Sequence, residues 1–213
     1  MDFLPEAIDN YVVAHSEPET EILKRLNTET WQKVIYPRML AGHLQGRVLS
    51  MLSHMIGPKQ VLELGTYTGY SAMCWTEGLQ EGGMVHTIDI NEEFAHMAGQ
   101  FWEAAGLSDK ITQHIGSGVD IIPTLDGPFD LVFLDADKDN YANYYDLVFD
   151  KVPSGGYIIA DNVLWSGKVV GDSNRMDKDT AALVAYNTKI HEDDRVQNVL
   201  FPIRDGLMIA RKK

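Results

Sequence analysis

Apolar residues in the first 57 positions recur at intervals of three and four along the chain. They include Ile22, Leu23, Leu26, Leu44, Val48, Leu49, Leu52 and Met55. This spacing places apolar side chains on one face of a helix, and it predicts a helical N-terminal region at residues 1–57. We expect the region to end at Gly57 and Pro58, because glycine followed by proline stops a helix.

From residue 58 onward, short apolar runs alternate with stretches of helical spacing. The runs are Val61–Leu64, Met84–Ile88, Ile111–Ile115, Phe129–Leu134, Tyr157–Ala160, Val196–Phe201 and Leu207–Ala210. Each has the length of a strand, and nearly continuous apolar runs such as Phe129–Leu134 are typical of strands buried on both faces. Helical connections between such strands indicate right-handed parallel crossovers. The pattern predicts a doubly wound α/β sheet of seven strands with helices on both faces.

The end of the chain departs from this alternation. Only a short turn at Arg204, Asp205 and Gly206 separates the last two runs. Strands joined by so short a connection are antiparallel, so we expect a mostly parallel sheet with one antiparallel edge-hairpin strand. The length suits one α/β domain, and no linker, internal repeat or low-complexity tract divides the chain. We therefore expect a single domain at 1–213, with N-terminal helices before a core at 58–213.

Composition narrows the possible partners and compartments. Thirty-one Asp and Glu against eighteen Lys and Arg give a net charge of -13. This charge disfavours contact with phosphates, so we expect no nucleic-acid partner and no association with an anionic membrane. Cys74 is the only cysteine, so we expect neither an intrachain disulfide nor a cysteine metal site. Together with a first segment that lacks a signal-peptide pattern, this predicts a cytoplasmic location.

A glycine-containing segment follows the first predicted strand. Within Glu63–Ser71, Gly65 and Gly69 allow the backbone to approach a ligand closely where the next helix begins. Tyr67 occupies the place of the second glycine in the dinucleotide pattern G-x-G-x-x-G, which disfavours a nicotinamide-dependent oxidoreductase. The alternative interpretation is a tight strand-to-helix turn that binds nothing.

Two further strand ends carry candidate ligand contacts. Asp89 ends the second predicted strand, where a carboxylate can accept hydrogen bonds from both hydroxyls of a ribose. In the alternative, it caps the helix predicted to begin near Glu92. After the third strand, Gly116, Ser117 and Gly118 form a turn that suits the edge of an adenine or, equally, the start of a helix.

The fourth and fifth predicted strands end in acidic residues. Asp135, Asp137 and Asp139 follow the fourth run, and Asp161 and Asn162 follow the fifth. Carboxylate and amide oxygens at one edge of a sheet are the hard ligands that Mg²⁺ prefers, so the sequence predicts a divalent-cation site. Without a cation these carboxylates would repel one another, so the alternative requires helix caps to absorb them.

Taken together, these motifs resemble those of the class I S-adenosylmethionine-dependent O-methyltransferases, in particular the cation-dependent group that contains catechol O-methyltransferase and caffeoyl-CoA O-methyltransferase. The resemblance extends from about Pro37 to the C-terminus. It is carried by Glu63–Ser71, Asp89, Asp135–Tyr141, Asp161–Trp165 and Asp205–Gly206. It implies a Rossmann-like fold, an S-adenosylmethionine cofactor and, as is common for such enzymes of this size, a homodimer.

The resemblance also implies roles for individual residues. S-adenosylmethionine would be held by Met39, Ala41, Glu63, Gly65, Thr66, Tyr67, Ser71, Asp89, Ser117, Gly118, Asp135 and Asp137. Mg²⁺, or another divalent cation such as Mn²⁺ or Ca²⁺, would be bound by Asp135, Asp161 and Asn162. Lys138 would be the catalytic base, and Lys138, Asn162 and Trp165 would contact the acceptor.

The implied reaction moves a methyl group to one hydroxyl of a phenolic acceptor. We expect a small catechol-type phenol, because a coenzyme A ester carries phosphates that a chain of net charge -13 meets with few cations. Ser166 stands where the plant caffeoyl-CoA enzymes have Asn, which favours the same choice. In the alternative, Lys168 and Arg175 bind the phosphates of an acyl thioester. A non-catalytic S-adenosylmethionine-binding scaffold is a further alternative, and the complete set of acceptor-side residues argues against it.

Overall fold

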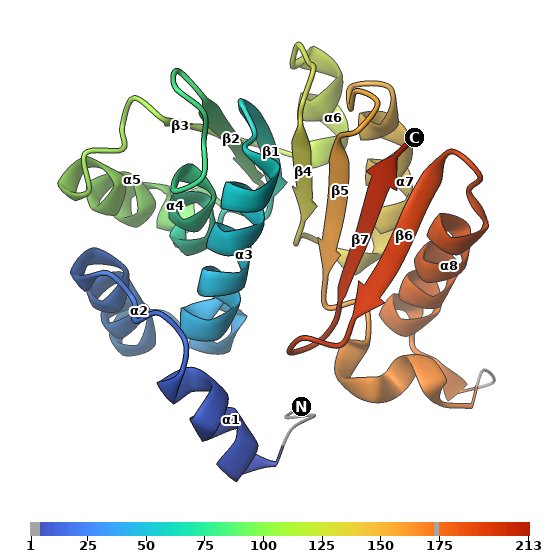
Figure 1. Cartoon of the computed structure of the whole chain (residues 1–213), viewed down its shortest axis with the longest axis horizontal. Coiled ribbons are helices and arrows are strands. Elements are labelled where there is room, and N and C mark those ends of the chain that lie inside the picture. Colours follow the sequence, from blue (N-terminus) through green and yellow to red (C-terminus); the bar gives the residue numbers. More distant parts are fainter. Residues whose placement is uncertain (1–4, 173–174) are drawn as a thin grey trace.

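Seven strands form the central sheet of the structure, a computed structural model that describes residues 5–172 and 175–213 (Figure 1). The strands are β1 (Gln60–Leu64), β2 (Met84–Asp89), β3 (Ile111–Ile115), β4 (Leu131–Leu134), β5 (Tyr157–Asp161), β6 (Val196–Phe201) and β7 (Leu207–Lys212). Their order across the sheet is β3-β2-β1-β4-β5-β7-β6. Neighbours from β3 to β5 are parallel, whereas β7 runs antiparallel to both β5 and β6. The predicted hairpin therefore lies at one edge, with β7 inserted between β5 and the edge strand β6.

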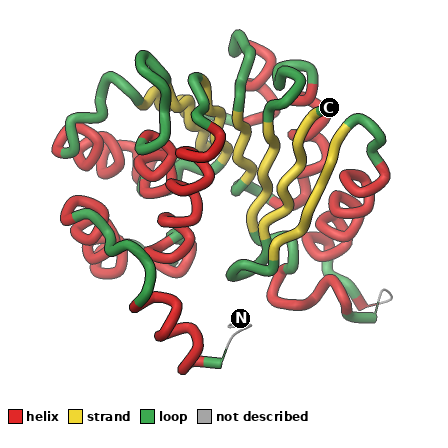
Figure 2. The backbone as a smooth tube through the Cα atoms, in the orientation of Figure 1, coloured by secondary structure: helices red, strands yellow, loops and turns green. Residues whose placement is uncertain are grey.

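Helices cover both faces of this sheet, as the sequence predicts (Figure 2). The α-helices are α1 (Glu6–Ala14), α2 (Glu21–Lys33), α3 (Gly42–Ile56), α4 (Tyr70–Thr76), α5 (Ala95–Ala104), α6 (Gly118–Ile121), α7 (Tyr141–Phe149) and α8 (Lys178–Glu192). The 3₁₀ helices are η1 (Pro37–Met39), η2 (Glu92–Phe94), η3 (Ile122–Thr124), η4 (Lys138–Asn140) and η5 (Trp165–Val170). Among the described residues, no helix has the length and apolarity needed to cross a membrane. The predicted α/β, Rossmann-like class is confirmed.

The N-terminal helices have clear local causes. The side chain of Thr20 caps α2 by accepting a hydrogen bond from the backbone N–H of Leu23. Leu23 and Leu26 are buried on the same side of α2, as their spacing predicts. Helix α3 ends at Gly57, whose φ of 59° is left-handed, and Pro58 cannot continue the helix. The stop therefore falls where the sequence places it.

Two hydrophobic cores lie on opposite faces of the sheet, because side chains along a strand alternate in direction. Leu62 of β1 belongs to the core that includes Tyr145 of α7 and Leu183 of α8. Its neighbour Val61 belongs to the core that includes Trp75 of α4. All five side chains are fully buried. Burial on both faces holds the strand ends, and therefore the loops that follow them, in fixed positions.

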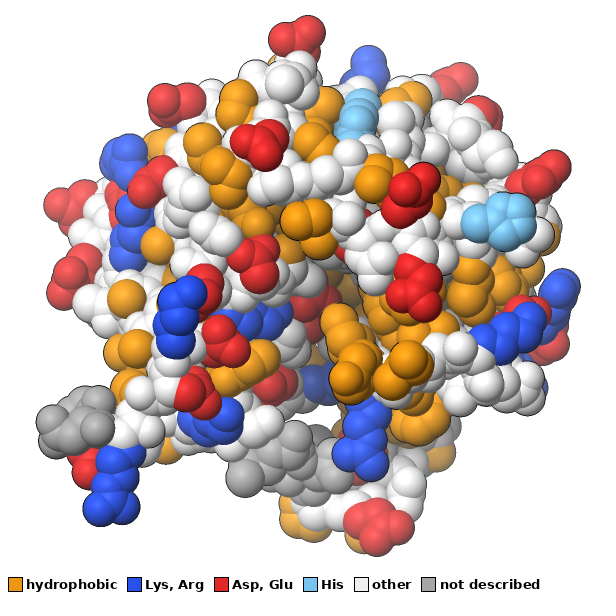
Figure 3. Space-filling view, turned by 180° about the vertical axis from the view of Figure 1, so that it is seen from behind, with side chains coloured by type: hydrophobic (Ala, Val, Ile, Leu, Met, Phe, Trp, Pro, Cys, Tyr) orange, Lys and Arg blue, Asp and Glu red, His pale blue; other side chains and the backbone are white. Residues whose placement is uncertain are grey.

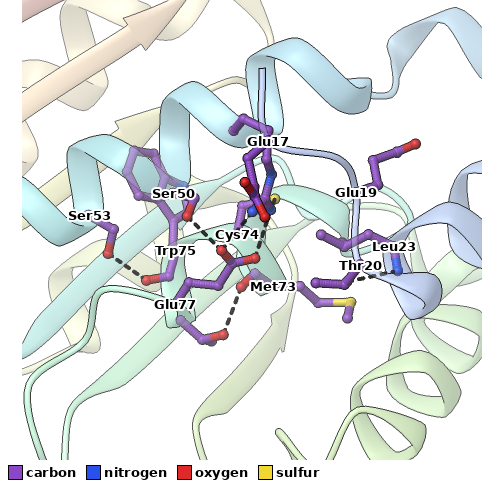
Figure 4. A network of polar contacts seen from close by, with 12 residues as sticks. Glu17, Glu19, Thr20, Leu23, Ser50, Ser53, Met73, Cys74, Trp75 and Glu77 are labelled. Carbon is purple, nitrogen blue, oxygen red and sulfur yellow. Dashed lines mark hydrogen bonds and ion pairs between the residues drawn. The ribbon is translucent and has the colours of Figure 1, made fainter. Parts of the chain in front are cut away.

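A polar network joins α3 to α4 and to the residue that follows α4 (Figure 4). The carboxylate of Glu77 accepts hydrogen bonds from Arg47 at 2.9 and 2.7 Å and from the hydroxyl of Ser50 at 2.6 Å. Nearby, the Ser53 hydroxyl donates to the carbonyl oxygen of Trp75 at 2.7 Å. We refer to Arg47, Ser50 and Glu77 as the α3–α4 network. It fixes α3 against the sheet-covering helix α4.

The register of the parallel strands brings several chain segments to one edge of the sheet. Leu134, the last residue of β4, pairs with Leu64 of β1 and with Ala160 of β5. The next residues, Asp135 and Asp161, therefore emerge side by side. Because β1 and β2 end at the same level, their loops open beside these carboxylates. We refer to this side of the sheet as the carboxyl edge, where ligands bind in open parallel sheets.

Candidate active site

A cavity of about 960 Å³ opens at the carboxyl edge. Viewed from behind, the molecule has a hollow below its centre where charged and apolar side chains meet (Figure 3). The cavity is lined by these predicted site residues: Met39, Ala41, Gly65, Thr66, Tyr67, Ser71, Asp89, Ser117, Gly118, Asp135, Asp137, Lys138, Asn162 and Trp165. The other two predicted residues, Glu63 and Asp161, are buried at the ends of β1 and β5. The fold thus brings the whole predicted set to one place.

Close packing explains why glycine occurs twice in the loop after β1. Gly65 has a φ of 104°, and a Cβ at this position would overlap the carbonyl oxygen of Asp135. Gly69 has a φ of 86°, and a Cβ there would press against the indole of Trp102. Only glycine adopts these conformations without strain and leaves room for the neighbours. We call residues 65–69 the glycine loop.

Asp89 is hydrogen-bonded to the backbone of the glycine loop. Its Oδ2 accepts a hydrogen bond from the backbone N–H of Tyr67 at 2.8 Å, and its Oδ1 accepts one from Asn91 N–H at 2.8 Å. The alternative in which Asp89 caps the next helix is wrong, because Asn91 is the N-cap of η2 and accepts from Glu93 N–H at 2.9 Å. Each carboxylate oxygen of Asp89 can accept a second hydrogen bond, so the residue can hold the loop and a ribose together.

Glu63 lies under the glycine loop and is fully buried. Its Oε2 accepts a hydrogen bond of 2.6 Å from Thr87, whose hydroxyl also lies 2.7 Å from that of Thr66. Its Oε1 has no hydrogen-bond partner among the described residues. Burial raises the pKa of Glu63 to about 8, although the hydrogen bond from Thr87 opposes the shift. A positively charged ligand bound nearby would therefore favour ionisation of this carboxyl.

The turn after β3 contributes backbone to the cavity wall. Ser117 precedes α6, and its side chain makes no capping hydrogen bond. Gly118 packs so closely that a Cβ would lie 3.0 Å from the ring of Tyr144 and 3.1 Å from Leu64. The segment is therefore both the start of a helix and a close-approach wall, and the two interpretations of its sequence are compatible.

Lys138 points into the cavity region, and its side chain is only 9% exposed. Its Nζ donates to the hydroxyl of Tyr141 at 2.6 Å and to Oδ1 of Asp135 at 3.1 Å. Nζ also lies 5.9 Å from the centre of the Trp165 ring. Burial, together with the charges of nearby carboxylates, keeps the pKa of Tyr141 well above its ordinary value, so its hydroxyl retains its proton. Lys138 is therefore a fixed side chain beside the ring of Trp165, and not a solvated surface lysine.

The other carboxylates after β4 have partners outside any helix cap. Asp137 precedes η4, but its side chain makes no capping hydrogen bond. Its Oδ1 accepts from the hydroxyl of Tyr144 at 2.5 Å, and its Oδ2 accepts from Asn140. Asp139 forms an ion pair with Lys178 of α8. Helix capping therefore does not account for this cluster.

The proposed metal ligands include a buried carboxylate oxygen without a hydrogen-bond partner in the described structure. Asp161 is 3% exposed, and its Oδ1 has no partner among the described residues. Burial and the nearby charge of Asp161 raise the pKa of Asp135, while Lys138 opposes this shift. Asn162 follows with a φ of 60° and lines the cavity. Two carboxylates and an amide oxygen suit a hard divalent cation, whose charge would relieve this repulsion.

A purely acidic or histidine-rich metal centre is not present in the described ranges. No group of three or more His, Cys, Asp or Glu side chains is arranged there to hold a metal. The predicted set contains only two carboxylates, because Asn162 is its third member. The residues therefore fit Mg²⁺ with open positions for water or substrate oxygens better than they fit a closed structural site.

Two residues at this edge were not expected from the sequence. Gln45 of α3 donates from Nε2 to Oδ2 of Asp161 at 2.6 Å. Arg204, in the turn between β6 and β7, donates from Nη1 to Oε1 of Gln45 at 2.5 Å and also to the carbonyl oxygen of Ala41. The sequence predicts a short turn at Arg204, and its neighbours Asp205 and Gly206 carry part of the resemblance, but no site role follows from the sequence for Arg204 itself. No local motif marks either residue, since their partners are far away in the sequence.

Residues 13–213 match the family model described as O-methyltransferase. The chain is 35% identical over 205 residues to caffeoyl-CoA O-methyltransferase 1 of Zea mays. The aligned region covers 91% of this chain and 79% of the relative. It is 31% identical over 211 residues to probable caffeoyl-CoA O-methyltransferase 2 of Dictyostelium discoideum, with 97% of this chain and 91% of the relative covered. The sequence relationship thus extends over nearly the whole chain.

Solved structures agree with this relationship. The O-methyltransferase of Bacillus cereus in complex with SAH has a TM-score of 0.89 and 27% identity, with 97% of each chain covered. TomG of Streptomyces achromogenes in complex with SAM has a TM-score of 0.88 and 26% identity, with 97% of this chain and 96% of TomG covered. The chain therefore belongs to the O-methyltransferase family and is an S-adenosylmethionine-dependent O-methyltransferase.

Proposed function

We propose that this enzyme methylates one hydroxyl of a small catechol-type phenol and requires a divalent cation, with Mg²⁺ as the first candidate and Mn²⁺ or Ca²⁺ as substitutes. The observation that carries the proposal is the meeting of three features at the carboxyl edge. They are the glycine loop hydrogen-bonded to Asp89, the carboxylates Asp135 and Asp161, and the fixed side-chain nitrogen of Lys138. They suit the methyl donor, a cation and the acceptor proton, respectively.

The residues of the chain have distinct tasks in this proposal. The glycine loop and Asp89 hold the donor, and Trp165 walls the acceptor ring on the side of Lys138. Methyl transfer is an in-line displacement, so holding both partners in line supplies much of the rate. A bound divalent cation orients vicinal oxygens and lowers the pKa of a hydroxyl.

In its neutral amine form, Lys138 accepts the hydroxyl proton at Nζ and becomes an ammonium, which Tyr141 and Asp135 keep in place. The acceptor oxygen then bonds to the methyl carbon while the bond from that carbon to sulfur breaks. The electron pair of the broken bond stays on sulfur, which leaves S-adenosylhomocysteine. General-base assistance of this kind contributes about 10² to 10⁴ in rate.

Charge supports a small phenol over a coenzyme A ester. The cavity lining includes the carboxylates of Asp89, Glu93, Asp135, Asp137, Asp139 and Asp179, and Lys138 is its only Lys or Arg among the described residues. Outside the cavity, Lys168 pairs with Asp177 at 2.9 Å and Arg175 with Asp172 at 3.8 Å. Lys168 and Arg175, which would meet the phosphates in that alternative, already face carboxylates, and the acidic cavity lining would repel a thioester tail.

A caffeoyl-CoA-type acyl thioester is the second candidate acceptor. It is favoured by the relatives from Zea mays and Dictyostelium discoideum, whose names specify that activity. Exposed ion pairs such as Lys168 with Asp177 are weak in water, so they can release a cation to a phosphate. A non-catalytic scaffold is disfavoured, because the acceptor side retains Lys138, Asp135 and Asp161. Lys138 is hydrogen-bonded to Asp135, and Asp135 is close enough to Asp161 for their charges to interact.

Steady-state kinetics after exhaustive chelation tests this proposal. EDTA should abolish turnover and Mg²⁺ should restore it; full activity without a cation contradicts the metal requirement. At equal Mg²⁺ and ionic strength, kcat/KM should be higher for catechol or caffeic acid than for caffeoyl-CoA. A clearly higher value for the thioester, together with its selective loss in Lys168→Met, supports the second candidate instead.

A homodimer and a cytoplasmic location are further parts of the proposal that come from the resemblance and the composition. Light scattering coupled to size-exclusion chromatography tests the first: a mass near twice 23.9 kDa is expected. Fractionation of cells that express the chain tests the second, and recovery with the membrane or periplasmic fraction contradicts it.

A further inference from the structure

The two carboxylate oxygens of Asp161 have different surroundings. Oδ2 accepts a hydrogen bond of 2.6 Å from Nε2 of Gln45, a residue of α3 that is only 2% exposed. Oδ1 is buried and has no partner among the described residues. A buried carboxylate oxygen without a partner costs free energy, so Oδ1 is the atom that a bound ligand would complete.

Arg204 determines how the amide of Gln45 is oriented. Its Nη1 donates to Oε1 of Gln45 at 2.5 Å. A guanidinium only donates and a carboxylate only accepts, so a flipped amide would set its NH₂ against Arg204 and its oxygen against Asp161. Both contacts would be repulsive. The amide therefore has one favourable orientation, with Nε2 directed at Asp161.

Arg204 occupies an unusual backbone conformation in the turn between β6 and β7. Its φ of 49° lies in the left-handed region, which is strained for a residue other than glycine. The same Nη1 also donates to the carbonyl oxygen of Ala41, the residue before α3 begins. The strained residue thus ties the hairpin to the first turn of the helix that carries Gln45.

A neutral amide suits this position better than the other polar side chains. A lysine or arginine in direct contact with Asp161 would neutralise the carboxylate that attracts a divalent cation. An apolar side chain would leave Oδ2 buried without a partner. Gln45 satisfies Oδ2 and preserves the charge of the carboxylate, which is what an outer partner of a metal ligand does.

We propose that Gln45, oriented by Arg204, is a positioning residue that holds one oxygen of Asp161 and leaves the other for a divalent cation. This inference rests on the proposed function, which supplies the cation. Gln45 itself does not contact the cation in this arrangement. It nevertheless makes cation affinity depend on α3, an element of the N-terminal region.

Binding of Mn²⁺ to the full chain, measured by isothermal titration calorimetry without an acceptor, tests the inference. Mn²⁺ prefers the same oxygen ligands as Mg²⁺. Gln45→Leu keeps the approximate size of the side chain and removes both hydrogen bonds. The Kd for Mn²⁺ should rise by about 10- to 100-fold, the range for losing an outer partner of a metal ligand.

The matched control is Ser53→Ala, which removes another buried hydrogen bond of α3, the one to the carbonyl oxygen of Trp75. It should lower the Tm and leave the Kd for Mn²⁺ unchanged. Arg204→Met is a second test variant, because this exposed side chain can be replaced without opening the core. It should raise the Kd in the same direction, by less than Gln45→Leu does.

The outcomes separate this inference from the proposed function. If every folded variant of Gln45 and Arg204 binds Mn²⁺ as tightly as the wild-type chain, the inference is overturned and the cation site stands. If the wild-type chain binds no Mn²⁺ at millimolar concentration, the metal requirement of the proposed function falls, and the inference falls with it. Weaker binding in Ser53→Ala equal to that in Gln45→Leu also overturns the inference, because it assigns the effect to α3 stability.

Discussion

Helix α3 carries two buried or partly buried polar residues that enter very different surroundings. Arg47 belongs to the α3–α4 network, where both oxygens of Glu77 accept hydrogen bonds from protein groups. Gln45 reaches the carboxyl edge, where Asp161 retains a buried oxygen without a partner in the described structure. In the first region, protein groups satisfy both oxygens of the carboxylate, although Nε of Arg47 is buried without a partner in the described structure. In the second region, one oxygen of the buried carboxylate has no protein partner, and this is the oxygen that the proposed cation would take.

The pKa shifts of the two regions follow the same division. Burial opposes ionisation in the α3–α4 network, but hydrogen bonds from Arg47 and Ser50 hold the pKa of Glu77 below its ordinary value. At the carboxyl edge, burial prevails and raises the pKa values of Glu63 and Asp135. Protein hydrogen bonds therefore stabilise the charged form of Glu77 in the structural network. At the candidate site, they do not outweigh the burial of Glu63 and Asp135.

The largest expected effect concerns rate and belongs to the carboxyl edge. Lys138→Met should lower kcat by about 10² to 10⁴, the contribution of a general base, while calorimetry shows nearly unchanged S-adenosylmethionine binding. The matched control is Lys189→Met on α8, which loses an exposed ion pair with Asp146 at 2.7 Å and should keep its kcat. A Lys138→Met enzyme with wild-type turnover at neutral pH would falsify the assigned role.

The next effect concerns stability as a function of pH. The folded-state pKa of Glu63 is raised to about 8 from 4.5, so the ligand-free folded chain binds a proton that the unfolded chain has released. The contribution of Glu63 to the free energy of unfolding is therefore fully present below pH about 4.5. It is lost as the pH rises to about 8, and its size is a few kcal/mol. Glu63→Gln should remove this part of the decline in urea unfolding curves. Parallel pH profiles for the two proteins contradict the assignment.

A smaller effect is expected when the α3–α4 network is broken. Arg47→Met leaves Glu77 without its bidentate partner and should lower the free energy of unfolding by about 2 kcal/mol, because the pair is largely shielded from water. Binding of S-adenosylmethionine by the folded variant should be unchanged. Lys33→Met, which removes an exposed pair with Glu29 within α2, provides the control and should cost less than 0.5 kcal/mol. Equal losses in both variants would show that burial of the network is unimportant.

The smallest effect comes from two histidines on neighbouring strands and has the opposite sign from that of Glu63. His86 and His114 lie 3.2 Å apart between Nδ1 and Nε2, and burial lowers the pKa of both, with His114 also lowering that of His86. The folded state binds fewer protons, so their contribution is complete above pH about 6.5 and declines as the pH falls. His114→Gln should reduce the loss of stability between pH 7 and 5 by about 1 kcal/mol or less, measured by chemical denaturation. A larger loss in the variant contradicts this sign.

Most of the fold could be predicted because burial on both faces of a parallel sheet leaves a simple pattern. The run Val61–Leu64 became β1, which begins one residue earlier, and Tyr157–Ala160 became β5, which continues into Asp161. The run at Phe129 begins before β4, because Phe129 N–H donates to Lys151 outside the sheet at 2.8 Å. Strand limits depend on such tertiary hydrogen bonds, which no run of apolar residues encodes.

The candidate site was predictable wherever a strand end supplies the residue. Asp89 and Asp135 follow apolar runs, and parallel strands deliver their ends to one edge, so their approach follows from topology. Gln45 and Arg204 were not predictable in this way. They meet across 159 positions in the sequence, one on a helix and the other in a turn, and neither belongs to a periodic pattern or a motif. Contacts of this kind arise only from the way the finished elements pack.

The close approach of Gly65 to Asp135 has a consequence for how such an enzyme can change its substrate. A side chain at Gly65 would collide with the backbone of Asp135, so the regions proposed for the donor and for the acceptor share one partition that tolerates no added atom. New acceptors cannot be accommodated by remodelling this partition without disturbing the donor. Ile35 and Tyr36 line the same cavity and are free of that constraint, because their side chains are largely exposed. In the proposed function, a change of acceptor would therefore be accommodated by these two exposed side chains, while the partition stays fixed.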